Sequence, residues 1–591
     1  KQDATDTSQV KVNQEEEAEE TLFQLKLGNL PRRATKKVIV ATVNEKVPLK
    51  DGTTLKIKKA PEWDHAILVL SSAQECERYR EALAGADIKG SVIEAEALPP
   101  KKFKQRMKDR NRRADTVNDD RTPLEMLRDQ ITPLWKKEYQ EQLDFKAHSV
   151  KKTIRKIGKL FDASSKNKDL SEERRSQLDW VYAGRTTNPF FGLQDPPVVP
   201  SDKQVGYRTK VEMTLGTDLE GKPTAGFLLG CYKDRVLAVG EHSMAINVSE
   251  RAHAVASVLQ SFLREKSKQP VWDRTAHSGF WRVVMIRTQE KGGVMAVVQV
   301  NESGIDPEEI KMEKQGLIDA FAATENIADT ILWQNFEGGH SGIKDNVPFD
   351  ILTGSGFVQD TLLNVRFNIS PTSFFQVNSN VAEAMYGYVR DLCLAEESNS
   401  NLPKMLLDIC CGTGTIGQLM ASAFAKVIGI DIVESAITDA RANAEANGIT
   451  NVEYFAGKCE DLLQDVISAQ VFGIQVDSQD SAAKKEGEGK VRRNPYHERQ
   501  GIEPKYACTA ILDPPRAGVN YKVIQAVRGL ETVKRVIFIA CDADKSSGNI
   551  FDLCRPTTNK FTGVPFKITK VQAFDMFPQT EQMEQVYLLE R

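Results

Sequence analysis

The sequence predicts a multidomain α/β protein that ends in a doubly wound domain, and three observations support this. Residues 405–409 form an apolar run typical of a buried parallel strand, and a glycine turn and a helical pattern follow. A second apolar strand, 427–430, ends at Asp431 and completes one βαβ half-unit. Between 205 and 367 the pattern changes to alternating strands, which indicates a separate β-rich domain. At 591 residues the chain is also too long for a single hydrophobic core.

The turn after the first of these strands has the residues needed for close approach of a ligand to the backbone. Gly412 and Gly414 leave room at the turn, and an acid about 20 residues further on, Asp431, is placed to accept hydrogen bonds from a ribose. The third glycine of a dinucleotide fingerprint is missing. The CGTG sequence, followed by a strand that ends in Asp, instead resembles the S-adenosyl-L-methionine loop of class I methyltransferases. A doubly wound domain without a nucleotide is the alternative at this point.

The composition limits which binding partners and which cell compartment we expect for the protein. The formal net charge is only −3, so any binding of nucleic acid must use local basic patches rather than a global positive field. No apolar run of about 18 residues occurs, and the first residues lack a signal-peptide pattern. We therefore expect an intracellular protein, in the cytosol, the nucleus or both, without a membrane partner. The nine cysteines form no CxxC pair or metal-type cluster, which predicts reduced thiols and no metal site.

The N-terminal region predicts a disordered tail and a small α+β domain. Residues 1–20 are polar and acidic without apolar periodicity, which favours disorder. Residues 21–100 follow a βαββαβ pattern, with strands at 23–31 and 66–72 and an amphipathic helix at 73–83. This pattern resembles an RNA recognition motif (RRM), but the aromatic side chains that stack on bases are absent from both strands. We therefore expect an RRM-like domain that contacts either RNA or another protein.

The rest of the chain divides into a linker and two further domains. Residues 101–195 are predicted to be a basic and helical linker, whose start, 101–113, carries eight positive side chains suited to phosphates or to nuclear targeting. Prolines then open the β-rich central domain, 196–368. The Rossmann-like domain is expected at 369–591, interrupted by a charged, flexible insertion at 478–504.

Three reactive side chains follow strands of the Rossmann-like domain. Asp431, Asp513 and Cys541 each come at a strand end, and the carboxyl ends of parallel strands share one rim of a sheet. Asp513 opens the sequence DPPR, in which Arg516 stands where methyltransferases of exocyclic amines carry an aromatic residue. An arginine is better suited to a phosphate or a uracil carbonyl.

Methylation at C5 of uracil requires two groups beside the cofactor. C5 is a weak nucleophile, and a thiolate that adds to C6 turns C5 into an enolate carbon that accepts a methyl group. A base must then remove the C5 proton so that the thiol leaves. Cys541 is the candidate thiol, and Glu584, near the end of the chain, is the candidate base. An ordinary exposed turn glutamate is the alternative for Glu584.

An ordered set of motifs covers nearly the whole chain: GYRTKVE (206–212), SFFQVN (373–378), LLDICCGTGTIG (406–417), DPPRAG (513–518), IACD (539–542) and DMFPQT (575–580). In this order they resemble the RNA uracil-5 methyltransferase family, in particular its eukaryotic tRNA-modifying members. The resemblance implies a nucleophile at Cys541 and a base at Glu584. It also implies that Arg208, Lys210 and Arg516 face the RNA. The residues that it implies for holding S-adenosyl-L-methionine are Gln376, Cys410, Gly412, Gly414, Thr415, Asp431 and Asp513.

The function implied by the resemblance is methylation of uridine C5 in tRNA, at the uridine of the T-loop, with no role for DNA. Two alternatives stay open. One is an RNA-binding or tRNA-folding protein whose methylation is incidental. The other is a cytosine-C5 RNA methyltransferase, which the missing cysteine beside DPPR disfavours. An iron–sulfur cluster is not expected, because the chain lacks the N-terminal cysteine set of some relatives.

Overall fold

The computed structural model divides into two compact units, residues 1–120 and 121–591. The expected tail at 1–20, the basic segment at 101–113 and the insertion at 478–504 lie wholly or largely outside the described residues. The described residues are 20–31, 36–47, 56–58, 65–70, 72–88, 91–103, 121–166, 170–187, 198–229, 237–338, 342–395, 401–474 and 501–591.

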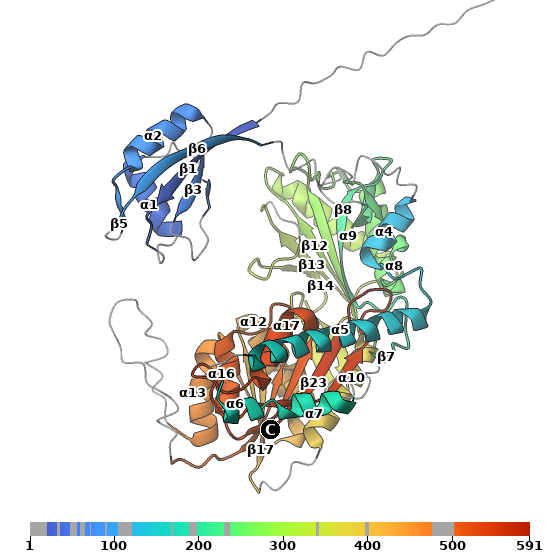
Figure 1. Ribbon diagram of the computed structural model, residues 1–591. Helices are drawn as coiled ribbons and strands as arrows, with labels where there is room; N and C mark the ends of the chain where they lie inside the picture. The colour runs from blue at the N-terminus through green and yellow to red at the C-terminus, as the bar shows by residue number, and fades with distance from the viewer. Residues whose placement is uncertain are drawn as a thin grey trace, which may run out of the picture. The chain divides into compact units, whose positions relative to one another are not determined.

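The described residues of the first unit form a four-stranded antiparallel sheet and two helices, in the βαββαβ order that the sequence predicts (Figure 1). Leu25 and Leu27 on β1 and Leu68 on β3 are buried against the helices, because alternate side chains of a strand point to one face. The opposite face of these two strands carries pairs such as Lys26 and Ile67 and no aromatic side chain. The sheet order is β2-β3-β1-β6, and the elements are β1 (Glu20–Gly28), α1 (Lys36–Lys46), β2 (Lys56–Lys58), β3 (Ala66–Leu70), α2 (Ala73–Leu83), β4 (Asp87–Ile88), β5 (Ser91–Val92) and β6 (Glu94–Phe103).

The central domain is built on a seven-stranded mixed sheet with two long helices. Ser249 and Asp306 cap these helices, since each side chain accepts a hydrogen bond from a backbone N–H of the first turn. The helices cover one face of the sheet, and Met285 and Met295 on the other face pack against the C-terminal domain. The sheet order is β10-β9-β8-β11-β12-β13-β14, and the elements are β8 (Lys210–Thr217), β9 (Pro223–Leu228), β10 (Val239–Glu241), η2 (His242–Met244), α8 (Glu250–Glu265), β11 (Trp281–Thr288), β12 (Val294–Val300), α9 (Pro307–Ala322), β13 (Thr330–Asn335) and β14 (Asp350–Thr353).

The C-terminal domain is a doubly wound sheet in the order β19-β18-β17-β20-β21-β23-β22-β7. The chain runs outward from β17 to β19 and then returns to β20, so the strand order reverses between β17 and β20. Ligands of such sheets bind outside the carboxyl ends of the strands at this switch point. Strands β15 (Val358–Leu362) and β16 (Val365–Ile369) form a separate two-stranded sheet that packs on this domain, although residues up to 368 were expected in the central domain. The other elements are α10 (Ser379–Leu394), β17 (Lys404–Ile409), α11 (Thr415–Met420), η3 (Ala421–Ala423), β18 (Lys426–Asp431), α12 (Glu434–Ala446), β19 (Val452–Ala456), α13 (Cys459–Phe472), β20 (Ala507–Leu512), α16 (Tyr521–Gly529), β21 (Val533–Ala540), α17 (Ala543–Cys554), β22 (Lys567–Phe574) and β23 (Glu584–Glu590).

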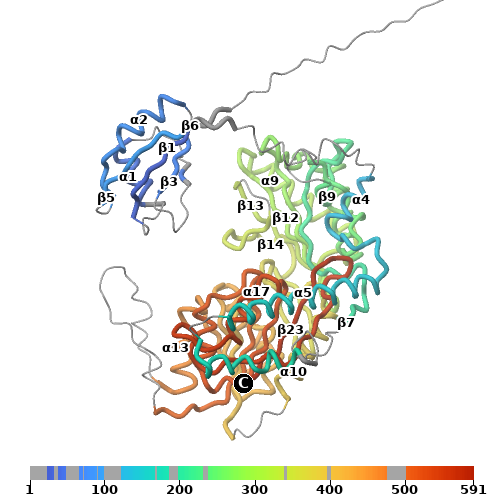
Figure 2. Tube along the Cα trace, in the orientation of Figure 1, coloured from blue at the N-terminus to red at the C-terminus, as the bar shows by residue number. Residues whose placement is uncertain are grey.

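The segment predicted as a linker differs from that expectation, because its long helix belongs to the core of the C-terminal domain. Helix α5 (Tyr139–Ser165) packs beside α17, as Figure 1 and Figure 2 show. Its apolar stripe includes Ile154 and Phe161, and burial of each such side chain contributes about 1.5–3 kcal/mol. Strand β7 pairs with β22 at the edge of the C-terminal sheet, although its residues were expected in the central domain. The neighbouring elements are α4 (Pro123–Ile131), α6 (Glu172–Ser176), α7 (Asp179–Thr187) and β7 (Val198–Val199).

Candidate active site

A cavity of about 770 Å³ lies at the switch point of the C-terminal sheet and extends toward the central domain. It brings together all of the predicted site residues except Gly414 and Lys210. Gly414 is the N-cap of α11, between the lining residues Thr413 and Thr415, and Lys210 lines an adjoining cavity. The predicted residues that line the main cavity are Arg208, Gln376, Cys410, Gly412, Thr415, Asp431, Asp513, Arg516, Cys541 and Glu584.

The glycine turn between β17 and α11 forms the floor of the cavity. Gly412 has φ +54° and open space where a Cβ would stand, so only a glycine leaves the backbone relaxed and accessible here. Gly414 has φ +69°, and a Cβ there would lie 2.5 Å from the Tyr454 hydroxyl. Asp431 is fixed from both sides, because its two carboxylate oxygens accept the N–H groups of Gly412 and Val433, each at 2.9 Å.

This floor fits the adenosyl cofactor that the sequence implies. The backbone at Gly412 is open to the cavity, and the oriented Asp431 carboxylate has lone pairs left to accept ribose hydroxyls. Asp408, in the strand before the turn, is fully buried and accepts the Gly417 N–H at 2.8 Å, which holds the first turn of α11 against β17. Burial raises the pKa of Asp408 to about 7.

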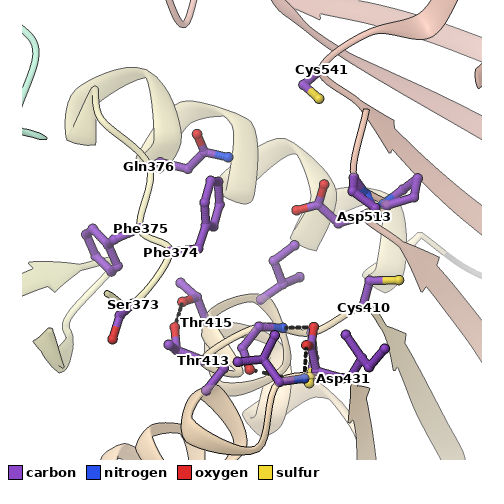
Figure 3. A pocket seen from close by; sticks show the side chains of 18 of the residues that line it. Ser373, Phe374, Phe375, Gln376, Cys410, Thr413, Thr415, Asp431, Asp513 and Cys541 are labelled. Atoms are coloured by element: carbon purple, nitrogen blue, oxygen red, sulfur yellow. Dashed lines mark hydrogen bonds between the residues drawn. The ribbon is translucent and has the colours of Figure 1, made fainter. Parts of the chain in front are cut away.

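The opposite wall of the cavity is the SFFQVN segment before α10. Figure 3 shows Gln376 on this wall and Asp513 and Cys541 on the other. The segment is fastened at its start, because Asp439 on α12 accepts the hydroxyl hydrogen bonds of Ser370 and Ser373. Gln376 is buried and lines the cavity beside Tyr386, and it opposes the rise in the pKa of the Tyr386 hydroxyl that burial causes.

The side chains of the second wall form a group of acids around one thiol. Cys541 directly follows β21 and is half-buried. Burial, followed by the charges of Glu584 and Asp513, raises its pKa to about 11, and Arg516 opposes this. Glu584 opens β23 and is only 4% exposed, and burial raises its pKa well above the ordinary value. Burial also raises the pKa of Asp513 to about 7.

The loop that leads to Glu584, residues 575–583, is clamped by α5. Lys146 forms a fully buried ion pair with Asp575 and donates to the Phe577 carbonyl at 3.0 Å. The Tyr139 hydroxyl donates to the same Asp575 carboxylate at 2.8 Å. The side chain of Gln142 accepts the backbone N–H of Gln579 in this loop and donates to the side-chain oxygen of the same residue. Helix α5 thus sets the position of Glu584 from a sequence distance of more than 400 residues.

The sequence analysis missed several residues of this site. Asp408 lies inside the quoted motif LLDICCGTGTIG, so its position before the turn was an available signal. Cys459, Tyr386 and Asp439 also line the cavity, but they stand in helical segments with no motif of their own. Lys146 lies in a basic helix, where nothing in its neighbours distinguishes a buried lysine from a solvated one.

A second cavity of about 530 Å³ adjoins the first on the side of the central domain. Arg208, Phe374 and Phe375 line both cavities, and Phe374 is 65% exposed. Burial, followed by the charge of Arg287, lowers the pKa of Lys210 in this cavity to about 8. The second cavity therefore adds a basic and aromatic edge, with Arg208, Lys210 and Phe374, to the cavity of the candidate nucleophile.

Two further findings apply to the part of the chain that the structure describes. None of its helices is long and apolar enough to cross a membrane. Among the same residues, no cluster of three or more histidine, cysteine or acidic side chains is arranged to hold a metal ion.

Comparisons with known proteins find methyltransferases over most of the chain. Residues 403–494 match the profile of a methyltransferase domain, and residues 488–591 match that of tRNA (uracil-5-)-methyltransferases. The tRNA (uracil-5-)-methyltransferase homolog A of Mus musculus is 29% identical over 574 residues, which cover 96% of this chain and 84% of that protein. Homolog B of Pongo abelii is 30% identical over 478 residues, which cover 79% of this chain and 87% of that protein.

The fold and the cavity define a class I methyltransferase, with an RRM-like unit and a central β-rich domain before the catalytic sheet. Within that class, the chain belongs to the tRNA (uracil-5-)-methyltransferase family, as its identity with homologs A and B across most of their lengths shows. The resemblance found in the sequence is thereby confirmed. A solved structure, the Pyrococcus abyssi tRNA (uracil-54, C5)-methyltransferase with S-adenosyl-L-homocysteine, is 19% identical with a TM-score of 0.49, covering 85% of this chain and 91% of that one.

Proposed function

We propose that the protein methylates C5 of a uridine in tRNA, with S-adenosyl-L-methionine as the methyl donor. The observation that carries the proposal is that one thiol, Cys541, and one carboxyl group, Glu584, line the same cavity as the glycine turn. The names of homologs A and B state this activity for those relatives. The T-loop uridine is the proposed target.

The cofactor would be held by residues of the floor and of both walls. S-adenosyl-L-methionine, when bound, supplies an electrophilic methyl group on a positively charged sulfur. Asp431 would accept the ribose hydroxyls, and the backbone at Gly412 leaves room for the nucleoside. Gln376 and Asp513 would hold the amino-acid part, since an amide and a carboxyl group are suited to its carboxylate and ammonium groups.

The chain supplies both the nucleophile and the base of the reaction. A uridine leaves its stack and enters the cavity. The Cys541 sulfur forms a bond to C6, and C5 becomes the carbon that takes up the methyl group. Glu584 then accepts the C5 proton, the C6–S bond breaks, and the thiolate leaves. Arg516, whose charge lowers the pKa of Cys541, stabilises that thiolate.

The second cavity supports an RNA substrate. Arg208 and Lys210 bring two positive charges next to the exposed ring of Phe374. Cations of this kind bind phosphates, and an exposed aromatic ring is suited to stack on a base. The nucleotides on either side of the target uridine would therefore occupy the second cavity.

The test uses tRNA that contains 5-fluorouridine. Fluorine at C5 cannot leave as a proton, so a ring attacked by Cys541 stays covalently attached after methyl transfer. In the presence of S-adenosyl-L-methionine we expect a shifted band on a denaturing gel. The band should be lost in Cys541→Ala and kept in Glu584→Gln, and the exposed Glu581→Gln is the matched control for the second variant.

Two outcomes would contradict the proposal. A chain that binds S-adenosyl-L-methionine but forms no band would exclude addition at C6. In a second experiment, the chain methylates tRNA without fluorine, and mass spectrometry identifies the product nucleoside. If the product is 5-methylcytidine rather than 5-methyluridine, uridine is excluded as the substrate.

A further inference from the structure

Two thiols that the proposed reaction does not use meet in the same cavity. Cys410 follows β17, and Cys459 is the first residue of α13. Both line the cavity, and both are free thiols. Figure 3 shows the Cys410 side chain between Asp513 and Asp431.

The backbone fixes this thiol pair. The carbonyl oxygen of Ile430, near the end of β18, accepts the Cys410 N–H at 2.9 Å and lies 3.8 Å from the Cys459 sulfur. Both cysteines are thus anchored to one atom of the sheet. Cys410 also has φ +66°, a conformation that a residue with a side chain adopts only where its surroundings impose it.

The two sulfurs differ in reactivity. Cys459 stands at the N-terminus of a 14-residue helix, where the backbone N–H groups favour a thiolate. Cys410 lowers the pKa of Cys459, against burial and the charges of Asp431 and Glu460. Cys459, together with burial, raises the pKa of Cys410. Cys459 is therefore the attacking sulfur and Cys410 its resolving partner.

We propose that Cys410 and Cys459 form a reversible disulfide when the chain meets hydrogen peroxide, and that this disulfide weakens binding of S-adenosyl-L-methionine. The second part rests on the cofactor site proposed above. The Cys459 thiolate attacks one peroxide oxygen, the O–O bond breaks, and a sulfenic acid forms while the hydroxide that leaves takes up a proton from solvent to become water. The Cys410 sulfur then attacks the Cys459 sulfur and releases a second water. Two thiols are oxidised and one peroxide is reduced, and a dithiol reverses the reaction.

The effect on the cofactor follows from the position of the bridge. Sulfurs in a disulfide lie about 2.0 Å apart, much closer than two thiols in contact. Closing that gap pulls the start of the glycine turn toward α13. Gly412, two residues after Cys410, carries the N–H that orients Asp431. We expect about tenfold weaker binding, the equivalent of one lost hydrogen bond.

The experiment uses the full chain in the Cys541→Ala background, which removes the thiol of the proposed nucleophile and needs no catalysis. After peroxide treatment and digestion, fragment mass spectrometry should find Cys459 linked to Cys410, and not to the adjacent Cys411. Calorimetry should give about tenfold weaker S-adenosyl-L-methionine binding after oxidation, restored by dithiothreitol. In Cys459→Ala, peroxide should leave the affinity unchanged relative to the same variant when reduced.

The wild-type chain gives a readout that depends on no variant. Absence of the Cys410–Cys459 linkage after peroxide treatment would overturn the proposal. A complete linkage with unchanged cofactor affinity would overturn the regulatory part. Failure of the reduced chain to bind S-adenosyl-L-methionine would instead overturn the proposed function, and the linked peptide would still establish the thiol pair. Saturating cofactor should slow the linkage, because it covers both sulfurs.

Discussion

Replacing Lys146 by methionine tests how the loop before Glu584 is held. The Lys146 ammonium group pairs with Asp575, and both side chains have 0% exposure. In Lys146→Met the buried carboxylate keeps the Tyr139 hydroxyl, at 2.8 Å, as its remaining partner among the described residues. Leaving a buried charge without its counterion costs about 3–5 kcal/mol. We expect the free energy of unfolding to fall by about this amount, less what the Tyr139 hydrogen bond recovers.

Urea unfolding followed by tryptophan fluorescence measures this loss. The matched control is Lys156→Met on the same helix, whose ion pair with Asp544, at 3.0 Å, is exposed on both sides. An exposed pair contributes about 1 kcal/mol or less. The double variant Lys146→Met/Asp575→Leu removes both charges and should recover most of the loss.

One result would refute this reasoning. If Lys146→Met destabilises the chain no more than Lys156→Met does, the buried pair does not hold the loop. A second readout follows the function, because a displaced loop displaces Glu584. Lys146→Met should therefore slow release of the covalent tRNA adduct more than its formation.

The remaining predictions concern charge and backbone. Because the Glu584 carboxylate raises the pKa of Cys541, Glu584→Gln should shift the pH profile of Cys541 alkylation to lower pH; an unchanged profile would contradict the proximity of the two groups. Lys210, with a pKa of about 8, is charged below that pH, so tRNA affinity should fall as the pH rises from 7 to 9, and Lys210→Met should lose this dependence. Gly414→Ala should lose about 1–3 kcal/mol and weaken cofactor binding, because its Cβ meets the Tyr454 ring, whereas Gly387→Ala inside α10 has open space and should be neutral or stabilising by thermal unfolding.

Local patterns predicted much of the fold. The helix expected at 73–83 is α2 to the residue, since a capping Ser72 and an amphipathic period are both encoded within one short segment. The strand, glycine turn and strand at 405–431 are β17, the Gly412 turn and β18 for the same reason. The helical pattern after residue 123 was also visible. The element that this helix packs against could not be predicted, because apolar spacing indicates that one face is buried and does not indicate which element covers it.

The candidate site shows the same division. Asp431, Asp513 and Cys541 each follow a strand, which predicted that they share one rim of the sheet, and all three line the cavity. Glu584 by itself resembled an exposed turn residue, yet it is 4% exposed and opens the strand beside β21. Only the antiparallel return of β23 between β21 and β22 brings this carboxyl group to the thiol.

The sequence by itself determined the elements, the glycine turn, the order of the motifs and the family. These depend on residues close together in the chain, where periodicity, caps and turn chemistry act directly. The tertiary structure alone decided which distant groups meet: Lys146 with Asp575, and Cys410 with Cys459. Such contacts depend on sheet order and on the path of each connection, so no local pattern carries them. The raised pKa values of Asp408, Asp513, Cys541 and Glu584 follow mainly from burial, which only the folded chain creates.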